Sequence, residues 1–276
     1  MEAVNAIKQD CSPAGIEAAA RHSLMVGKGH LQKVRDWVKK PPQGLDVLEL
    51  GPGPDFGSTL TLAAMGARIA VADRWLPVWD PEYHGAVYRR LAGLITEQLP
   101  GADVTPILKL VEANAHLPEV VTTYPDAETL AHAPDRSFDL VISNAVYEHI
   151  VDVVAATQRV FDVLRPGALS VQQVDLRDHR NFDAPLEYLL MTPQEEAAWL
   201  RETEHHQGCQ RRRAEYEAAF DRAGFQILSA WIDTRAQPDY MAGFLPRLRA
   251  YEGARFQHAD PSELEDLGIC YVHRRP

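Results

Sequence analysis

The stretch from Leu45 to Asp73 constrains the fold of this chain more than any other part of its sequence. Val47, Leu48 and Leu50 form a short apolar run, which glycines follow at once; a helix-compatible segment comes next, and a second apolar run ends at Asp73. This order predicts a strand, a tight loop, a helix and a strand. In such a βαβ unit the loop lies at the carboxyl edge of the sheet, where glycines let the backbone approach a ligand and an acid binds a ribose diol. We therefore expect an adenosine-containing ligand.

The residues of the loop indicate which adenosine compound binds. From Gly51 to Gly57 the loop reads GPGPDFG. A dinucleotide-binding loop has the pattern G-x-G-x-x-G, and its glycines let a pyrophosphate sit on the helix N-terminus. The loop of this chain has one more residue before its third glycine than that pattern. Asp55 and Glu49 stand near the expected pyrophosphate position, and carboxylates repel that group but attract the ammonium and sulfonium of S-adenosylmethionine (SAM). The loop therefore favours SAM, and an NAD-dependent oxidoreductase is a less favoured alternative.

Three stretches carry a family resemblance. ELGPG at Glu49–Gly53, with the acid that ends the next strand, resembles the first two motifs of class I SAM-dependent methyltransferases. SFDLVISNAVYEHI at Ser137–Ile150 and VLRPG at Val163–Gly167 resemble later motifs of that family, in the same order. The resemblance implies an α/β fold: a Rossmann-like seven-stranded sheet with helices on both faces, the last strand antiparallel, and an N-terminal helical cap.

The same resemblance implies cofactor contacts at the ends of strands. An acid in the turn after the third strand commonly binds the adenine amino group in this family; Asp126 followed by Ala127 fits, and Glu128 is the alternative. Asn144 ends the fourth strand and would offer its amide to the amino-acid part of the cofactor or to the substrate. The predicted cofactor-binding residues are Glu49, Gly51, Gly53, Asp73, Arg74, Asp126, Ala127 and Asn144.

A polar segment, DLRDHRNF, follows the fifth expected strand, Ala168–Val174. It lies at the carboxyl edge, where open α/β sheets carry their chemistry. His179, held by Asp178 or Asp175, is the first catalytic candidate, as a base or a group that orients the substrate. Alternatively, Asp178 and Arg177 pair and only fix the loop.

Tyr147, Glu148 and His149 follow the fourth expected strand directly. Tyr147 is the second catalytic candidate, because we expect it to be the more exposed of the three. His149 has the ordinary pKa of a general base, but a structural role is favoured for Glu148 and His149, since such a pair often begins a helix in this family. The histidines are scattered along the sequence, so no metal is expected.

Composition excludes several classes of protein. The formal net charge is −11, and no long run of Lys or Arg is present, which argues against a nucleic-acid substrate. The short cluster Arg211–Arg213 is interpreted as the polar side of a helix. Cys11, Cys209 and Cys270 are far apart, which suits reduced thiols better than disulfides. No signal peptide or membrane-length apolar run is visible, so a cytoplasmic protein without membrane contact is expected.

The expected domain organisation is a cap over 1–44 and a methyltransferase domain over 45–276. Insertions are expected near 74–118, 183–210 and 233–265. The first is rich in aromatic residues, which pack a helix on the sheet or wall a ligand: Trp75, Trp79, Tyr83, His84 and Tyr88. The last is expected to be a loop that covers a substrate or makes a dimer contact, so a homodimer is a possible assembly; its apolar residues are Tyr240, Met241, Phe244 and Leu245.

The function that follows is methyl transfer from SAM to an O, N or C atom of a small molecule. Bacterial methyltransferases of natural-product and surface-polysaccharide pathways carry a segment similar to Asp175–His179, so secondary metabolism or surface-polysaccharide biosynthesis is the expected setting. Two alternatives remain open. One is intramolecular cyclisation of SAM with release of methylthioadenosine; the other is a SAM-binding protein without catalytic activity.

Overall fold

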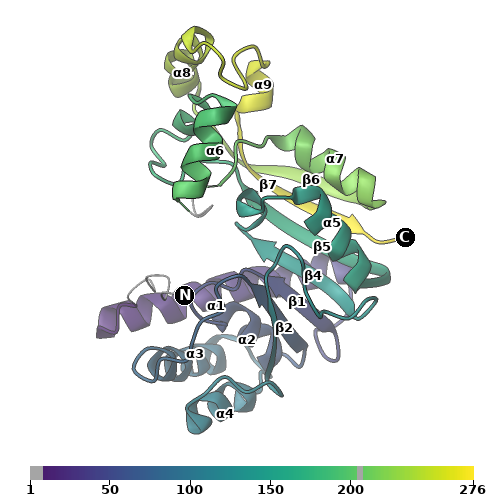
Figure 1. Ribbon diagram of the computed structural model, residues 1–276. Helices are drawn as coiled ribbons and strands as arrows, with labels where there is room; N and C mark the ends of the chain where they lie inside the picture. Colours follow the sequence, from purple (N-terminus) through teal and green to yellow (C-terminus); the bar gives the residue numbers. More distant parts are fainter. Residues whose placement is uncertain (1–8, 204–207) are drawn as a thin grey trace. The chain divides into compact units, whose positions relative to one another are not determined.

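The computed structural model describes residues 9–203 and 208–276 (Figure 1). Residues 1–8 of the expected cap and 204–207 of the expected second insertion lie outside the described residues. Over the described ranges, seven strands form one mixed sheet in the order β3-β2-β1-β4-β5-β7-β6, which confirms the predicted sheet. The strands are β1 Asp46–Leu50, β2 Arg68–Asp73, β3 Val121–Pro125, β4 Phe138–Asn144, β5 Leu164–Asp175, β6 Gln226–Arg235 and β7 Asp266–Arg274.

The last strand runs antiparallel between its neighbours, as predicted. β7 pairs with β5 and with β6, for example through Val171 opposite Val272 and Trp231 opposite Cys270. Every residue of β7 except the last is buried, including the apolar run from Leu267 to Val272. β1, β2 and β3, at the opposite end of the strand order, pair in parallel.

The chain divides into two compact units. One comprises the residues up to Ala127 together with Phe138–Ile142; the other comprises Glu128–Ser137 and Ser143–Pro276. Among the described residues, no helix is both long and apolar enough to cross a membrane.

The first unit contains a long N-terminal helix, as predicted. Ser12 caps this helix by accepting a hydrogen bond from the Gly15 N–H, and the helix packs against α2 and α3. A Cβ added to Gly27 would lie 2.5 Å from the Thr61 Cβ, so the glycine permits the close approach of α1 to α2. The helices of this unit are α1 Pro13–Lys33, the π-helix η1 Val34–Val38, α2 Gly57–Ala64, α3 His84–Gln98 and α4 Thr105–Ala113.

The second unit holds the remaining helices. α7 ends at Gly224, whose φ of 90° is the left-handed conformation that glycine adopts readily. The helices of this unit are the 3₁₀-helix η2 Tyr147–His149, α5 Val153–Val163, the 3₁₀-helix η3 Glu187–Leu189, α6 Pro193–Glu202, α7 Arg213–Ala223, α8 Pro238–Ala250 and α9 Pro261–Leu264.

The segment that was expected to be a loop, 233–265, is largely helical, which corrects the sequence interpretation. α8 and α9 form most of it (Figure 1). Met241 and Phe244 are buried in a hydrophobic cluster with Leu186 and Tyr188. Burial of these apolar side chains inside the unit gives the segment a stabilising role, in place of the expected substrate cover or dimer contact for Met241 and Phe244.

Arg212 is also placed differently from the expectation. It is only 3% exposed, and its guanidinium donates to the carbonyls of Leu176, Leu264 and Asp266. A buried guanidinium is stable when its donors are satisfied in this way. Arg212 therefore joins three segments of the second unit and does not belong to the polar side of a helix.

Candidate functional site

The glycine loop leaves β1 through two residues in the left-handed conformation. Gly51 has a φ of 62° and Gly53 a φ of 79°, values that residues with a Cβ rarely adopt. The Gly51 N–H donates to the Ala72 carbonyl at 2.9 Å and ties the loop to β2. Apart from its chain neighbours, no atom of residues 9–203 or 208–276 lies within 4 Å of a Cβ built on Gly53, so the described part of the chain leaves space beside this residue.

Glu49 lies on β1 just before the loop, but its carboxylate is turned into the protein. It is 2% exposed and bonds to His30 Nε2 at 3.0 Å, to Ser58 Oγ at 2.9 and 2.8 Å, and to Thr59 Oγ1. Burial raises the pKa of Glu49, but the imidazole of His30 and the hydroxyl donors outweigh it, and the net shift is downward. The geometry thus gives Glu49 the position of a residue that holds the loop rather than one that touches a ligand.

Asp55 within the loop is likewise buried. Its carboxylate accepts hydrogen bonds from Ser23 Oγ at 2.9 Å, from the Gly57 N–H at 2.8 Å and from Tyr83 Oη at 3.3 Å. Burial raises its pKa, which these donors partly offset. The charge argument from the sequence placed Glu49 and Asp55 beside the ligand; both carboxylates in fact have protein partners.

The aromatic segment after β2 supports the loop. His84 Nε2 lies 3.1 Å from the Pro54 carbonyl, and the Phe56 N–H donates to Tyr88 Oη at 3.3 Å. Tyr83 also contacts the Asp55 carboxylate. Three aromatic side chains of this segment thus hold three successive residues of the loop, 54 to 56. Trp75 differs from them, because it is 39% exposed.

Two predicted acids lie side by side at the ends of β2 and β3. Asp73 pairs in register with Pro125, and the Asp126 N–H donates to the Asp73 carbonyl at 2.9 Å. Asp126 has a φ of 64°, so its backbone turns sharply away from β3. Burial raises the pKa of Asp73, and the nearby charge of Asp126 adds to this rise, whereas N–H donors from Trp75 and Arg74 lower it.

Two further predicted cofactor residues, Arg74 and Ala127, follow these acids directly in the sequence. Arg74 is exposed and its guanidinium lies 5.5 Å from the centre of the Trp75 ring. Ala127 is buried. Glu128, the alternative to Asp126, accepts hydrogen bonds from the N–H groups of Val151 and Asp152 at 3.0 and 3.4 Å.

Asn144 and Tyr147, both in the second unit, have opposite exposures. Asn144 ends β4 and is exposed. Tyr147 was expected to be exposed, and this expectation is wrong: it is fully buried, with its ring 5.7 Å from that of Phe220. Burial also raises the pKa of its hydroxyl well above the ordinary value. A ring enclosed in this way favours a packing role, and the catalytic role of Tyr147 stays a prediction from the sequence.

The pairing in the segment after β5 also differs from the expectation. Arg177 pairs with Asp175 at 2.8 and 2.6 Å, and Arg180 pairs with Asp178. The alternative interpretation, in which Asp178 pairs with Arg177, is therefore wrong, because each arginine folds back on the acid two residues before it. His179 Nε2 lies 4.0 Å from Asp175 Oδ2.

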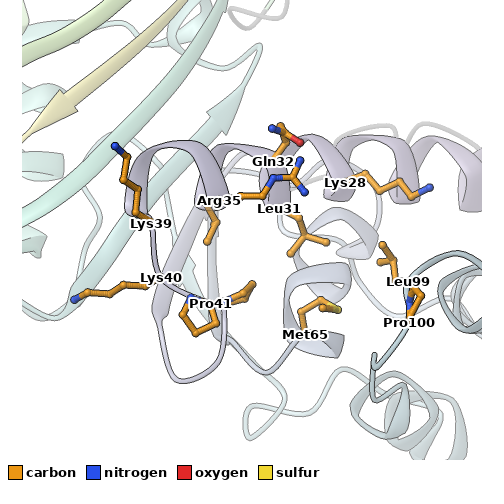
Figure 2. A pocket seen from close by; sticks show the side chains of 12 residues that line it. Lys28, Leu31, Gln32, Arg35, Lys39, Lys40, Pro41, Met65, Leu99 and Pro100 are labelled. Atoms are coloured by element: carbon orange, nitrogen blue, oxygen red, sulfur yellow. The ribbon is translucent and has the colours of Figure 1, made fainter.

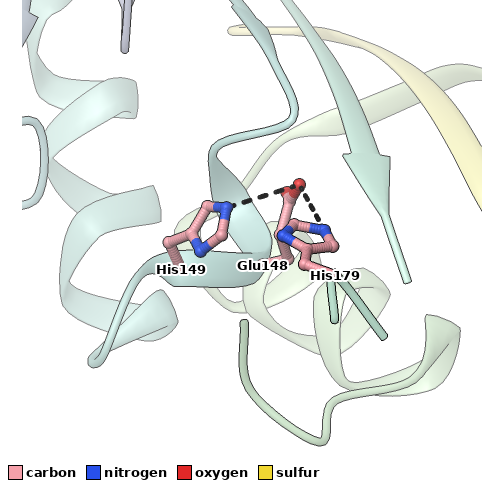
Figure 3. A group of neighbouring side chains, drawn as sticks. All are labelled: Glu148, His149 and His179. Atoms are coloured by element: carbon pink, nitrogen blue, oxygen red, sulfur yellow. Dashed lines mark ion pairs between the residues drawn. The ribbon is translucent and has the colours of Figure 1, made fainter. Parts of the chain in front are cut away.

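The structure brings Glu148 and His149 to the predicted catalytic histidine. Nε2 of His149 and Nε2 of His179 each lie 3.9 Å from Glu148 Oε1, and the two imidazole rings are 5.0 Å apart (Figure 3). The sequence analysis favoured a structural role for the Glu148-His149 pair. The sequence contained one indication of this cluster. Glu148 and His149 follow β4, and His179 follows β5, so all three residues come soon after the carboxyl ends of strands.

A hollow of about 800 Å³ lies elsewhere in the first unit (Figure 2). It is lined by the basic side chains of Lys28, Arg35 and Lys39, and by Met65, which caps the C-terminal end of α2. The glycine loop is at the N-terminal end of α2, and a helix of eight residues is about 12 Å long. This hollow is thus separate from the loop, and the sequence analysis did not predict it.

Comparisons with known proteins identify the family. Residues 28–230 match a family model described as a methyltransferase domain. Among solved structures, a SAM-dependent methyltransferase from Mesorhizobium loti is 18% identical, with 89% of this chain and 100% of that chain covered and a TM-score of 0.48. A candidate sarcosine dimethylglycine methyltransferase from Galdieria sulphuraria is 14% identical, with 97% and 91% covered and a TM-score of 0.49.

A third solved structure, phosphoethanolamine N-methyltransferase 2 from Haemonchus contortus in complex with SAM, is 15% identical; 93% of this chain and 52% of that chain are covered, with a TM-score of 0.48. The assignment rests on the family model, which spans most of the chain. SAM is the cofactor of this family. The chain belongs to the class I SAM-dependent methyltransferases.

Proposed function

We propose that this protein transfers the methyl group of SAM to a small molecule, and that the ends of β1, β2 and β3 hold the cofactor. The observation that carries the proposal is the adjacency of Asp73 and Asp126, joined by the hydrogen bond from the Asp126 N–H to the Asp73 carbonyl. In parallel neighbouring strands the carboxyl ends meet at one edge, and the left-handed Gly51 and Gly53 leave β1 at the same edge.

The residues at this edge fit the chemical groups of SAM. The carboxylate of Asp73 has a raised pKa because it is partly buried, and hydroxyl donors of a ribose would stabilise its charged form. Asp126 supplies an acceptor for an adenine amino group, and the following Ala127 supplies a backbone N–H. The open space at Gly53 admits a ligand close to the backbone. Glu49 contributes indirectly, because its buried contacts fix the strand from which the loop departs.

SAM, when bound, supplies a methyl group that its sulfonium already activates. The residues of the chain then have to bind the cofactor, align the acceptor and exclude water. We propose that the exposed Asn144 at the end of β4 offers its amide to the cofactor or to the acceptor. We propose His179 as the residue that orients the acceptor, supported by its two neighbouring carboxylates, Glu148 and Asp175.

The acceptor is proposed to be a small molecule with a nucleophilic O, N or C atom. The net charge of −11 gives no support to a polyanionic substrate such as DNA or RNA. Secondary metabolism or surface-polysaccharide biosynthesis, a cytoplasmic location and a homodimer stay predictions from the sequence.

Product analysis tests the proposed reaction. The purified protein is incubated with SAM alone and with SAM plus a cell extract, and S-adenosylhomocysteine (SAH) and methylthioadenosine are measured by mass spectrometry. We expect SAH only when extract is present, and no SAH from the extract with heat-inactivated protein. Methylthioadenosine formed from SAM alone would instead identify intramolecular cyclisation. SAM binding without either product, across extracts that contain varied small molecules, would identify a SAM-binding protein without catalytic activity.

A further inference from the structure

Three donor side chains meet in the second unit. Glu148 and His149 are consecutive residues of η2, and His179 lies in the segment that follows β5. One carboxylate oxygen and one nitrogen from each imidazole all lie within 4.8 Å of one another (Figure 3). The expectation of a metal-free protein relied on the histidines being scattered, but the fold gathers two of them at one carboxylate.

Glu148 has an unusual environment for a carboxylate. The residue is 2% exposed, and neither carboxylate oxygen has a hydrogen-bond partner of good geometry among residues 9–203 and 208–276, although the backbone N–H groups of Glu148 and Asp175 lie near it. A buried carboxylate without a donor is costly unless a proton or a cation stabilises it. The two neighbouring imidazoles make a metal cation the better fit.

The donor set and its spacing match those of divalent transition metals. Two imidazoles and one carboxylate bind zinc or iron in known enzymes and leave coordination positions open. Ligand atoms about 2.1 Å from a metal are roughly 3–4 Å from each other, depending on the angle at the metal. Both imidazole nitrogens lie 3.9 Å from the Glu148 oxygen, so only small side-chain rotations are needed.

The surroundings keep these side chains in place and leave them reachable. The Cys209 N–H donates to the Glu148 carbonyl at 2.7 Å, and a Cβ on Gly208 would lie 3.6 Å from the Glu148 side chain. The side chains of His149 and His179 are 28% and 19% exposed. His179 Nε2 and both Glu148 oxygens are themselves buried, so a cation reaches them past the exposed part of the imidazole rings after a small side-chain movement.

Other charged groups face the cluster. Asp175 lies 4.0 Å from His179 Nε2 and adds negative charge that attracts a cation, although its own carboxylate is paired with Arg177. Arg177 contributes the opposing positive charge, and its guanidinium lies 4.3 Å from the centre of the Phe182 ring. We do not count Asp175 among the ligands, because its two oxygens already serve this arginine.

We propose that Glu148, His149 and His179 bind one divalent transition-metal cation, with zinc as the representative ion, and that its remaining positions accept oxygen ligands. Through this cation the cluster would hold water or an oxygen-bearing substrate. The proposal concerns cation binding alone, so it can fail while methyl transfer stands, and methyl transfer can fail while the cation binds.

Metal titration of the full-length protein tests the site. Protein stripped with a chelator is titrated with Zn²⁺ by calorimetry and with Co²⁺ by visible absorption. We expect one cation per chain and Co²⁺ bands typical of nitrogen and oxygen ligands. Each of the variants His149→Ala, His179→Ala and Glu148→Gln should weaken binding by at least about tenfold. The matched control His258→Ala removes an exposed histidine elsewhere and should leave the affinity unchanged.

Two results would overturn the proposal. One is the absence of Zn²⁺ and Co²⁺ binding up to millimolar concentration, in which case Glu148 is simply held protonated. The other is binding that all three variants retain. Circular dichroism and thermal unfolding of each variant identify any loss of fold, and Glu148→Gln keeps the size of the buried side chain, so the test does not depend on the alanine variants alone.

Discussion

Nε2 of His30 lies 3.0 Å from Oε1 of Glu49, and both side chains are almost completely buried. This contact joins the N-terminal helix α1 to β1 immediately before the glycine loop. Ser58 and Thr59 at the start of α2 bond to the same carboxylate. The acid of the ELGPG motif therefore fastens three elements of the first unit together, and its removal has consequences for stability that a ligand contact would not have.

Glu49→Gln should destabilise the protein at neutral pH by on the order of 3 kcal/mol, because it leaves His30 without a charged partner in the interior. The pKa of Glu49 is lowered in the folded state, so its contribution is present above the ordinary value of 4.5 and is lost as the pH falls through the folded value. Urea unfolding of both proteins measures this. The difference should shrink on acidification, and Glu252→Gln, at an exposed position, should show no difference at either pH. A deficit that does not depend on pH would contradict the role of charge.

Two glycines of α1 should respond oppositely to alanine. A Cβ on Gly27 would meet Thr61 at 2.5 Å and the Ser58 carbonyl at 2.9 Å, whereas a Cβ on Gly29 meets nothing within 4 Å. We expect Gly27→Ala to cost about 1–3 kcal/mol through overpacking, and Gly29→Ala to stabilise by about 0.5–1 kcal/mol through helix propensity. Thermal unfolding compares the two variants. Equal effects would contradict the close packing of α1 on α2.

His273 should make stability depend on pH between neutrality and mild acid. It lies on β7 with its ring 3.8 Å from that of Phe220, and burial lowers its pKa from 6.5 to about 3. Below pH 6.5, His273 is therefore protonated in the unfolded chain but stays neutral in the folded chain. The free energy of unfolding falls as the pH drops. From pH 7.5 to 5 the loss from this residue should be about 2 kcal/mol. His273→Leu should remove this part of the pH dependence in urea unfolding; an unchanged slope would contradict the assignment.

The sequence predicts those elements whose signals are local. Val47, Leu48 and Leu50 stand next to glycines, so strand and loop are visible in a few residues, and Gly224 marks the end of α7. The helix α8 was missed because Gly243 and Pro246 interrupt its pattern. Burial of Arg212 and Tyr147 was missed for another reason: the partners that enclose them come from distant parts of the chain.

The candidate sites show the same division. Asp73 ends the apolar strand β2 and Asp126 directly follows β3, so their meeting at one edge can be predicted from the order of the strands. The pairing of Glu49 with His30, or of Glu148 with His179, depends on how helices and loops pack on those strands. No periodicity in the sequence carries that information, so the protein partners of Glu49 and Asp55 could not be predicted from the sequence.

His179→Ala should lower turnover more than it lowers the affinity for SAM, because we assign His179 to the acceptor. Tyr147→Phe is the matched comparison: its ring is buried against Phe220, so turnover should stay unchanged. Once product analysis provides an acceptor, steady-state kinetics and SAM titration of the two variants measure both quantities. Equal kinetics in His179→Ala and the unmodified protein would remove His179 from the mechanism.

The affinity of the variant Asp73→Ala for SAM shows whether Asp73 binds the ribose of the cofactor. Two hydrogen bonds from a ribose to this carboxylate are worth about 1.5–3 kcal/mol each, and 1.4 kcal/mol corresponds to about tenfold in affinity. Calorimetric titration should show SAM binding to the unmodified protein and to Asp221→Ala, an exposed acid on α7, with equal affinity. Asp73→Ala should bind at least about tenfold more weakly. A loss of less than about threefold would contradict the account of the cofactor site.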